Sequence, residues 1–163
     1  MKAKNLVLGA LLTALALVIP IYFGGYLRIY IPPFSATLAS HVPVMLAFLV
    51  NPLVAVMVGL GSTIGFLVML GPVIAARAFI HVIFGYVGAK LINKGYTFEK
   101  ALLLTAPLHA FGESLVVLPF GFTLYTALVL VGIGTLLHHF ADSIISVILA
   151  RTVLSGIMNK IKN

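Results

Sequence analysis

The stretch PVIAARAFIHVIFGYVGAKLI, residues 72–92, is mostly apolar but carries Arg77 and His81 one helical turn apart. It is long enough to cross the roughly 30 Å hydrocarbon core of a bilayer as a single α-helix. An ionisable side chain at the bilayer centre costs roughly 2.5–3.5 kcal/mol on insertion scales, and such residues usually face a bundle interior or a water-filled cavity. The stretch therefore predicts a membrane-spanning helix whose polar face is turned towards other helices.

Two more pairs of ionisable residues have the same spacing in apolar surroundings: His109 with Glu113, and His138 with Asp142. Residues four apart lie on one face of a helix, so each pair projects into a single place. These pairs indicate that something polar is bound, conducted or chemically handled inside a membrane protein.

The composition places the whole chain in the membrane. Of its 163 residues, 62% are hydrophobic and only 8% are charged, and the mean hydropathy is +1.22. Apolar stretches recur along the entire length, which predicts a single transmembrane domain over residues 1–163 in the cell membrane. The chain has no cysteine, so disulfides and thiolate metal sites are excluded.

The positions of the basic residues explain the formal charge of +7 by membrane topology, so no nucleic-acid partner is expected. Six spans are expected at Ala3–Phe23, Ser35–Val50, Pro52–Leu70, Pro72–Ile92, Phe98–Leu118 and Leu124–Ser155. The basic residues that then share one side are Lys2, Lys4, Lys90, Lys94, Lys100, Arg151, Lys160 and Lys162. Only Arg28 lies on the other side, so the positive-inside rule predicts an all-α bundle of six transmembrane helices with both termini in the cytoplasm.

The first outer connection, residues 24–34, is long and alternates Tyr26, Arg28 and Tyr30 with apolar residues. Such alternation indicates an extended segment, which can cover an outward-facing cavity as a lid. An aromatic anchor at the membrane interface is an equally good interpretation, because the chain has no tryptophan to supply one.

Ala10 and Ala14 on the first helix form a small-xxx-small motif, which lets two helix backbones approach closely. Packing within the bundle is a competing explanation, since Gly61 and Gly65 offer the same spacing. The motif alone does not distinguish a subunit interface from the core of the protein itself.

Arg77 lies near the outer face, where its planar guanidinium suits a carboxylate ligand. An internal ion pair with Glu113 or Asp142 is the competing interpretation. Glu113 is expected to contact either a ligand or Arg77, and Asp142 is expected to pair with His138 or with a neighbouring helix.

The five histidines raise the question of a metal site, because imidazole binds zinc, cobalt and nickel. No HExxH motif is present, and His138 and His139 point about 100° apart on a helix. His41 shortly precedes Pro43, which frees a carbonyl that can give the imidazole a partner. We therefore expect no metal and no cofactor, with the histidines bonded across helices or to an organic ligand.

No catalytic signature is visible in the sequence: it lacks a serine-nucleophile motif, a phosphatase-like array of acids, a phosphate-cradling loop and a nucleotide-binding motif. The chain is not expected to be an enzyme. An intramembrane enzyme that uses His109 and Glu113 as an acid–base pair stays open as an alternative. Energy for uphill transport would have to come from another protein.

The sequence combines six predicted helices, basic ends, the Ala10xxxAla14 motif, a long first outer loop and polar groups on predicted helices four to six. In these features it resembles the substrate-binding S-components of energy-coupling factor vitamin transporters. The segments SATLASHVP, residues 35–43, and RAFIH, residues 77–81, look most like the niacin-specific branch. The resemblance implies vitamin uptake with a transmembrane coupling subunit, which would face Ala10 and Ala14, and with two cytoplasmic ATPase subunits. It also implies that the protein topples in the bilayer.

The resemblance further implies a ligand site near the outer face, beneath the loop from Tyr26 to Tyr30. For nicotinate, Arg77 would meet the carboxylate, while His81, His109 or Glu113 would address the pyridine nitrogen. Tyr30, Phe79, Tyr86 or Tyr125 would stack on the ring. The rest of the expected substrate-binding set consists of Tyr30, Phe79, Tyr125 and His139.

Other ligands stay open at this point. If Glu113 accepts a hydroxyl group, a pyridoxine-like or hydroxymethylpyrimidine ligand fits better than nicotinate. A transition-metal uptake subunit is disfavoured, because the metal-specific members of the family depend on a histidine close to the N-terminus and the first histidine here is His41.

Overall fold

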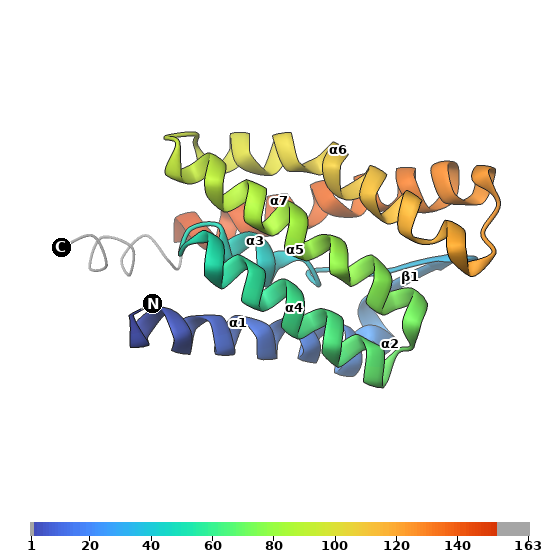
Figure 1. Ribbon diagram of the computed structural model, residues 1–163, viewed down its shortest axis with the longest axis horizontal. Coiled ribbons are helices and arrows are strands. Elements are labelled where there is room, and N and C mark those ends of the chain that lie inside the picture. The colour runs from blue at the N-terminus through green and yellow to red at the C-terminus, as the bar shows by residue number, and fades with distance from the viewer. Residues whose placement is uncertain (1, 153–163) are drawn as a thin grey trace.

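The computed structural model describes residues 2–152 as a bundle of long helices lying side by side (Figure 1). Within these residues, five helical segments are long and apolar enough to cross a membrane. They are α1 (Ala3–Tyr22), α4 (Pro52–Met69), α5 (Pro72–Asn93), α6 (Phe98–Val116) with the short 3-10 helix η1 (Leu118–Phe120) after it, and α7 (Gly134–Thr152) with the π-helical stretch η2 (Thr126–Ile133) before it. The predicted all-α membrane class is confirmed.

Local signals in the sequence define where α4, α5 and α6 begin. The side chain of Asn51 caps α4 by accepting a hydrogen bond from Val54 N at 3.0 Å. Gly71 has a φ of 92°, which side-chain-bearing residues rarely adopt, and this lets the chain turn sharply into α5. The side chain of Thr97 caps α6 by accepting from Lys100 N at 3.3 Å. The predicted starts of these three spans therefore agree with the structure.

The structure differs from the prediction over Ser35–Val50, where one helix was expected. The first residues belong to strand β2 (Phe34–Thr37), and the later ones form a short helix, α3 (Val42–Ala47). Between them, Ala39 has a left-handed φ of 69°, which interrupts any helix. Pro43 lies in the first turn of α3, where the missing N–H of proline is not needed. The predicted count of six full helical spans is therefore not confirmed.

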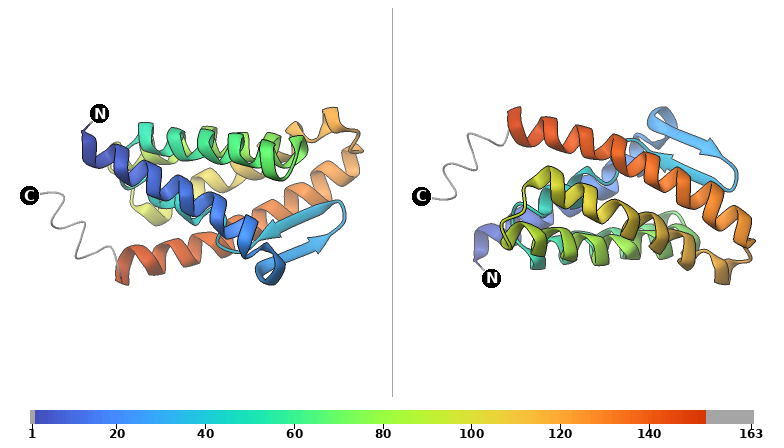
Figure 2. Two further views of the ribbon diagram at one scale, coloured as in Figure 1. Left: turned by 90° about the horizontal axis from the view of Figure 1, so that it is seen from below. Right: turned by 90° about the horizontal axis from the view of Figure 1, so that it is seen from above.

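The long first connection folds into a β-hairpin after the four-residue helix α2 (Gly24–Leu27). Strand β1 (Arg28–Ile31) pairs antiparallel with β2, with Arg28 opposite Thr37. The extended geometry predicted from the alternation of this loop is therefore confirmed over β1. All of β1 is exposed, whereas β2 is mostly buried and contacts α7 at one end of the bundle (Figure 2).

The start of α1 and the end of α7 lie at the same end of the bundle, opposite the hairpin (Figures 1 and 2). The segment from β2 through α3 brings the chain back towards the start of α4, and so replaces the predicted second helix. Lys160, Lys162 and the predicted end of the last helix at Ser155 lie outside the described residues.

Glycines allow α4 to pack closely against its neighbours. A Cβ atom at Gly59 would lie 2.6 Å from the backbone nitrogen of Val82 on α5. A Cβ atom at Gly61 or Gly65 would collide with side chains of α1. The Gly61 and Gly65 spacing noted in the sequence is therefore used for packing inside the bundle.

We predict that Gly59→Ala destabilises the protein, because its new methyl group meets the backbone of α5 and cannot be relieved by a side-chain rotation. Overpacking of this kind costs about 1–3 kcal/mol. Thermal unfolding in detergent, followed by circular dichroism, should show a lowered midpoint. Gly25→Ala is the matched control, because a Cβ atom there has no neighbour within 4 Å. Equal midpoints for the two variants would contradict the prediction.

Candidate binding site

Arg77 of α5 and Glu113 of α6 form an ion pair inside the bundle. Arg77 Nε donates to Glu113 Oε2 at 2.9 Å, and Nη2 lies 2.8 Å from the same oxygen. Nη1 donates to the backbone oxygen of Ser35 in β2 at 3.0 Å. Only 8% of Arg77 and 2% of Glu113 are exposed. Each charge neutralises the other, and the pair also ties the hairpin to α5.

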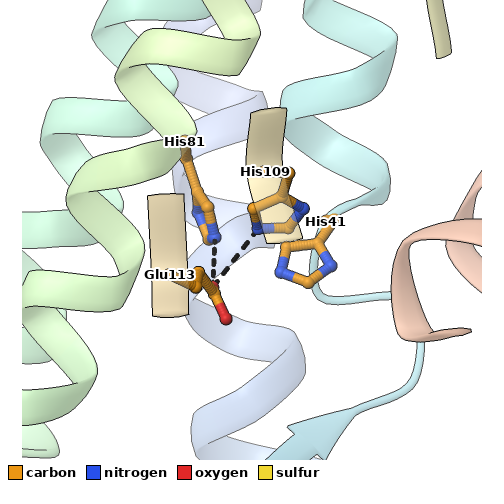
Figure 3. A group of neighbouring side chains, drawn as sticks. All are labelled: His41, His81, His109 and Glu113. Atoms are coloured by element: carbon orange, nitrogen blue, oxygen red, sulfur yellow. Dashed lines mark hydrogen bonds and ion pairs between the residues drawn. The ribbon is translucent and has the colours of Figure 1, made fainter. Parts of the chain in front are cut away.

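The two carboxylate oxygens of Glu113 have different surroundings. Oε2 accepts hydrogen bonds from Arg77 and from Thr135 Oγ1 of α7, the latter at 2.6 Å. Oε1 lies 3.2 Å from His109 Nε2 and 3.8 Å from His81 Nε2, and both rings point towards it (Figure 3). Glu113 is thus the meeting point of α5, α6 and α7.

A chain of imidazole contacts continues from Glu113 into the core. His109 Nδ1 lies 3.0 Å from His139 Nδ1, and His139 Nε2 lies 3.0 Å from the carbonyl oxygen of Leu102. Both histidines are fully buried. They therefore lie behind the carboxylate and link α6 to α7.

Asp142 of α7 is the centre of a second polar cluster. Its Oδ1 accepts from Ala39 N at 2.7 Å, and its Oδ2 accepts from His41 N at 2.9 Å. His41 Nδ1 and His138 Nε2 each lie 3.2 Å from Oδ2. The predicted pairing of Asp142 with His138 is confirmed, and Asp142 also fixes the turn between β2 and α3.

A cavity of about 170 Å³ lies between these clusters and the hairpin. Pockets for drug-sized ligands are roughly 300–1,000 Å³, so this cavity suits a smaller molecule. Phe66 and Leu70 of α4 contribute apolar surface to it. Its charged and imidazole-bearing lining residues are Arg28, His41, Arg77, His81, Glu113 and His138.

The structure brings Arg77, His81 and Glu113 of the predicted substrate-binding set together at the cavity. The other two predicted polar residues, His109 and His139, are buried behind it. The predicted aromatic residues lie outside the cavity lining and are 43% to 67% exposed. They are Tyr30, Phe79, Tyr86 and Tyr125.

Most lining residues were not in the predicted set, and they include Arg28, His41, Phe66 and His138. Arg28 and His41 reach the cavity because the hairpin and the turn after it fold over the bundle, which no local spacing indicates. Arg28 did carry a usable signal, since it was the single basic residue expected on the outer side. A lone cation opposite the cytoplasmic side was a candidate ligand contact.

Arg28 supplies a second guanidinium to the cavity. Within the described residues it has no acidic partner, and its guanidinium carbon lies 5.7 Å from the centroid of the Tyr30 ring. Arg77, by contrast, is paired with Glu113. Arg28 therefore adds a positive charge that is not neutralised locally, and this favours an anionic ligand.

The outer surface of α1 carries the predicted small-residue motif. Ala10 and Ala14 are exposed, whereas Gly9 and Ala16 are buried against the bundle. Among the described residues, Ala10 and Ala14 thus form a free face and do not belong to the core.

Apolar spanning helices around a small polar cavity define a multi-pass protein of the cell membrane with the architecture of a small-molecule binder. The chain is 33% identical to the niacin transporter NiaX of Lactococcus lactis subsp. cremoris (strain MG1363), over an alignment that covers 99% of this chain and 82% of that protein. The chain belongs to the S-component family of energy-coupling factor transporters, in the niacin branch. No family model matches the chain. No solved structure matches it either.

We predict that Asp142→Asn destabilises the protein, because an amide keeps one acceptor oxygen and cannot accept from Ala39 N and His41 N through two separate oxygens. Leaving a buried donor unsatisfied costs about 1–3 kcal/mol. The thermal midpoint in detergent should fall.

Glu99→Gln is the matched control for this acid-to-amide change. Glu99 pairs with Arg151 on the surface at 2.6 Å, and an exposed pair contributes only about 0–1 kcal/mol. If Asp142→Asn unfolds no earlier than Glu99→Gln, the anchoring role of Asp142 is refuted.

Proposed function

We propose that the protein is the niacin-binding S-component of an energy-coupling factor importer, with uptake powered by a separate coupling subunit and two ATPase subunits. The observation that carries this proposal is the small cavity lined by two guanidinium groups, Arg28 and Arg77. The relationship to a niacin transporter supports the same ligand. The protein then acts as a transporter component and not as an enzyme.

Nicotinate fits the charge and the size of this cavity. It is a single aromatic ring with one carboxylate, and planar guanidinium groups bind carboxylates through paired N–H donors. Arg77 Nε and Nη2 are directed at Glu113 and Nη1 donates to Ser35, so Arg77 offers the ligand one remaining N–H group on each terminal nitrogen. Arg28 has no acidic partner among the described residues and offers all the N–H groups of its guanidinium to the ligand. We assign the ligand's carboxylate to these two residues.

The other parts of nicotinate also find complementary surroundings. His81 lines the cavity and can hydrogen-bond the pyridine nitrogen through its imidazole. Phe66 offers an apolar face to the ring. The ion pair of Arg77 with Glu113 provides charged groups at the floor of the cavity, and their opposite charges cancel before the ligand enters.

We place the hairpin end of the bundle on the outer side of the membrane and both termini in the cytoplasm. Lys2, Lys4, Lys90, Lys100 and Arg151 lie near the end of the bundle opposite the hairpin. The positive-inside rule assigns such a cluster to the cytoplasmic side. The cavity, which the hairpin covers, then receives its ligand from outside.

The exposed face of α1 is the proposed contact with the coupling subunit. Ala10 and Ala14 leave a shallow surface against which another helix can pack closely in the membrane. Because Gly61 and Gly65 already serve the packing between α1 and α4, the alanine motif is free for a partner.

Calorimetry on the purified protein in detergent tests the ligand. We predict tight binding of nicotinate and much weaker binding of nicotinamide, because the amide cannot neutralise a guanidinium. Arg28→Gln should weaken nicotinate binding by roughly 10- to 100-fold, the value of a hydrogen bond to a charged group. The same change should affect nicotinamide far less.

Arg151→Gln is the matched control, since Arg151 lies at the other end of the bundle in a surface pair with Glu99. It should leave the affinity for nicotinate unchanged. Pyridoxine is included as a neutral comparison ligand. Preference for pyridoxine, or equal binding of nicotinate and nicotinamide, would refute the carboxylate site.

Substitutions on α1 test the coupling face. Ala10→Trp and Ala14→Trp should abolish niacin uptake by cells that contain the coupling and ATPase subunits, because a bulky ring blocks close helix contact. Nicotinate binding by the purified variants should remain, since neither residue lines the cavity. Leu11→Trp is a control on the same helix, because Leu11 is already large and exposed. An equal loss of binding would show that the alanines support the fold.

A further inference from the structure

The contacts around His139 determine which nitrogen of each imidazole carries a proton. The carbonyl oxygen of Leu102 can only accept, so His139 Nε2 donates to it. In a neutral ring the other nitrogen, His139 Nδ1, then has a lone pair. His109 Nδ1 must therefore donate to His139 Nδ1. A neutral His109 is left with a lone pair on Nε2.

This lone pair faces a carboxylate. His109 Nε2 lies 3.2 Å from Glu113 Oε1, and both atoms are acceptors when His109 is neutral and Glu113 is ionised. The hydrogen bonds from Arg77 and Thr135 go to the other oxygen, Oε2, so they do not relieve this contact. Two acceptors at this distance require either a proton or a cation between them.

Two further imidazoles converge on the same place. Nitrogen atoms of His41, His81 and His109 and a carboxylate oxygen of Glu113 all lie within 4.8 Å of one another (Figure 3). These four residues are 0% to 6% exposed, and three of them line the cavity. The space between these two acceptors therefore adjoins four groups that are able to bind a metal ion.

We propose that His41, His81, His109 and Glu113 bind one divalent transition-metal ion of the zinc type at the floor of the cavity. Zinc holds nitrogen and oxygen ligands at about 2.0–2.2 Å in a tetrahedron, so neighbouring ligand atoms lie roughly 3.3–3.6 Å apart. Glu113 Oε1 lies 3.2 Å from His109 Nε2 and 3.8 Å from His81 Nε2, on either side of this range. All four ligand atoms lie within 4.8 Å of one another, so the side chains would move closer together to bind the ion.

The groups around the four ligands support the same assignment. In metal sites, a ligating histidine usually donates its second N–H to another acceptor, and a ligating carboxylate is itself hydrogen-bonded. His109 makes such a contact to His139, and Glu113 receives hydrogen bonds from Arg77 and Thr135. Both outer contacts leave the inner atoms, His109 Nε2 and Glu113 Oε1, directed at the ion.

His138 and Asp142 form a second group with His41, and these two residues are not part of the proposed site. Both oxygens of Asp142 already accept backbone N–H groups, from Ala39 and His41. His138 Nε2 lies 3.0 Å from the carbonyl oxygen of Thr37. Binding of an ion there would break contacts that hold the turn, so His138 serves as a control.

Zinc binding to the purified protein tests the site without any vitamin present, so the result does not depend on the proposed niacin function. The protein is treated with a chelator, dialysed and titrated with zinc chloride by calorimetry, and with cobalt chloride by visible absorption. We expect one ion per chain, a raised thermal midpoint with zinc, and the absorption bands of tetrahedral cobalt. His81→Gln should weaken zinc binding by at least about tenfold.

His138→Gln is the matched control and should keep zinc affinity within about twofold of the unchanged protein, because glutamine can still donate to Thr37 and Asp142. Size-exclusion chromatography and the metal-free thermal midpoint check that both variants are folded. Absence of stoichiometric zinc binding would show that a proton lies between His109 and Glu113, and this would overturn the proposal. Equal weakening by His81→Gln and His138→Gln would overturn it as well.

Discussion

The ion pair between Arg77 and Glu113 is the interaction on which the rest of the structure depends. An unpaired charge inside a membrane bundle is costly, and pairing is the way an arginine is retained on a spanning helix. This pair does more than neutralise charge, because Arg77 also holds Ser35 of β2 and Glu113 also holds Thr135 of α7. It therefore joins the hairpin, α5, α6 and α7 at one point, and the cavity forms beside that point.

Most of the fold could be predicted, because hydropathy reports directly on which segments cross a membrane. Asn51, Gly71 and Thr97 marked helix starts through local capping and turn geometry. The segment Ser35–Val50 could not be predicted in the same way. Its composition suits a membrane helix, but strand pairing with β1 and the hydrogen bonds from Ala39 and His41 to Asp142 are contacts between distant parts of the chain.

The candidate site was predictable where one residue carried the signal by itself. Arg77 and Glu113 stood out as charges in apolar runs, and the structure places both at the cavity. Phe79 is two residues beyond Arg77, which is roughly 200° around a helix, so it faces outward when Arg77 faces inward. Arg28 and His41 required knowledge of the hairpin and of the turn that follows it. The grouping of His41, His81 and His109 likewise comes from three separate segments and leaves no spacing motif.

Strand β1 has one further consequence. It is paired on one side with β2, and among the described residues its other edge has no neighbour. Backbone N–H and C=O groups along a free edge need water, and hydrocarbon offers none. The edge from Arg28 to Ile31 must therefore lie at the level of the lipid headgroups or above it, which fixes how deeply the whole protein sits in the bilayer.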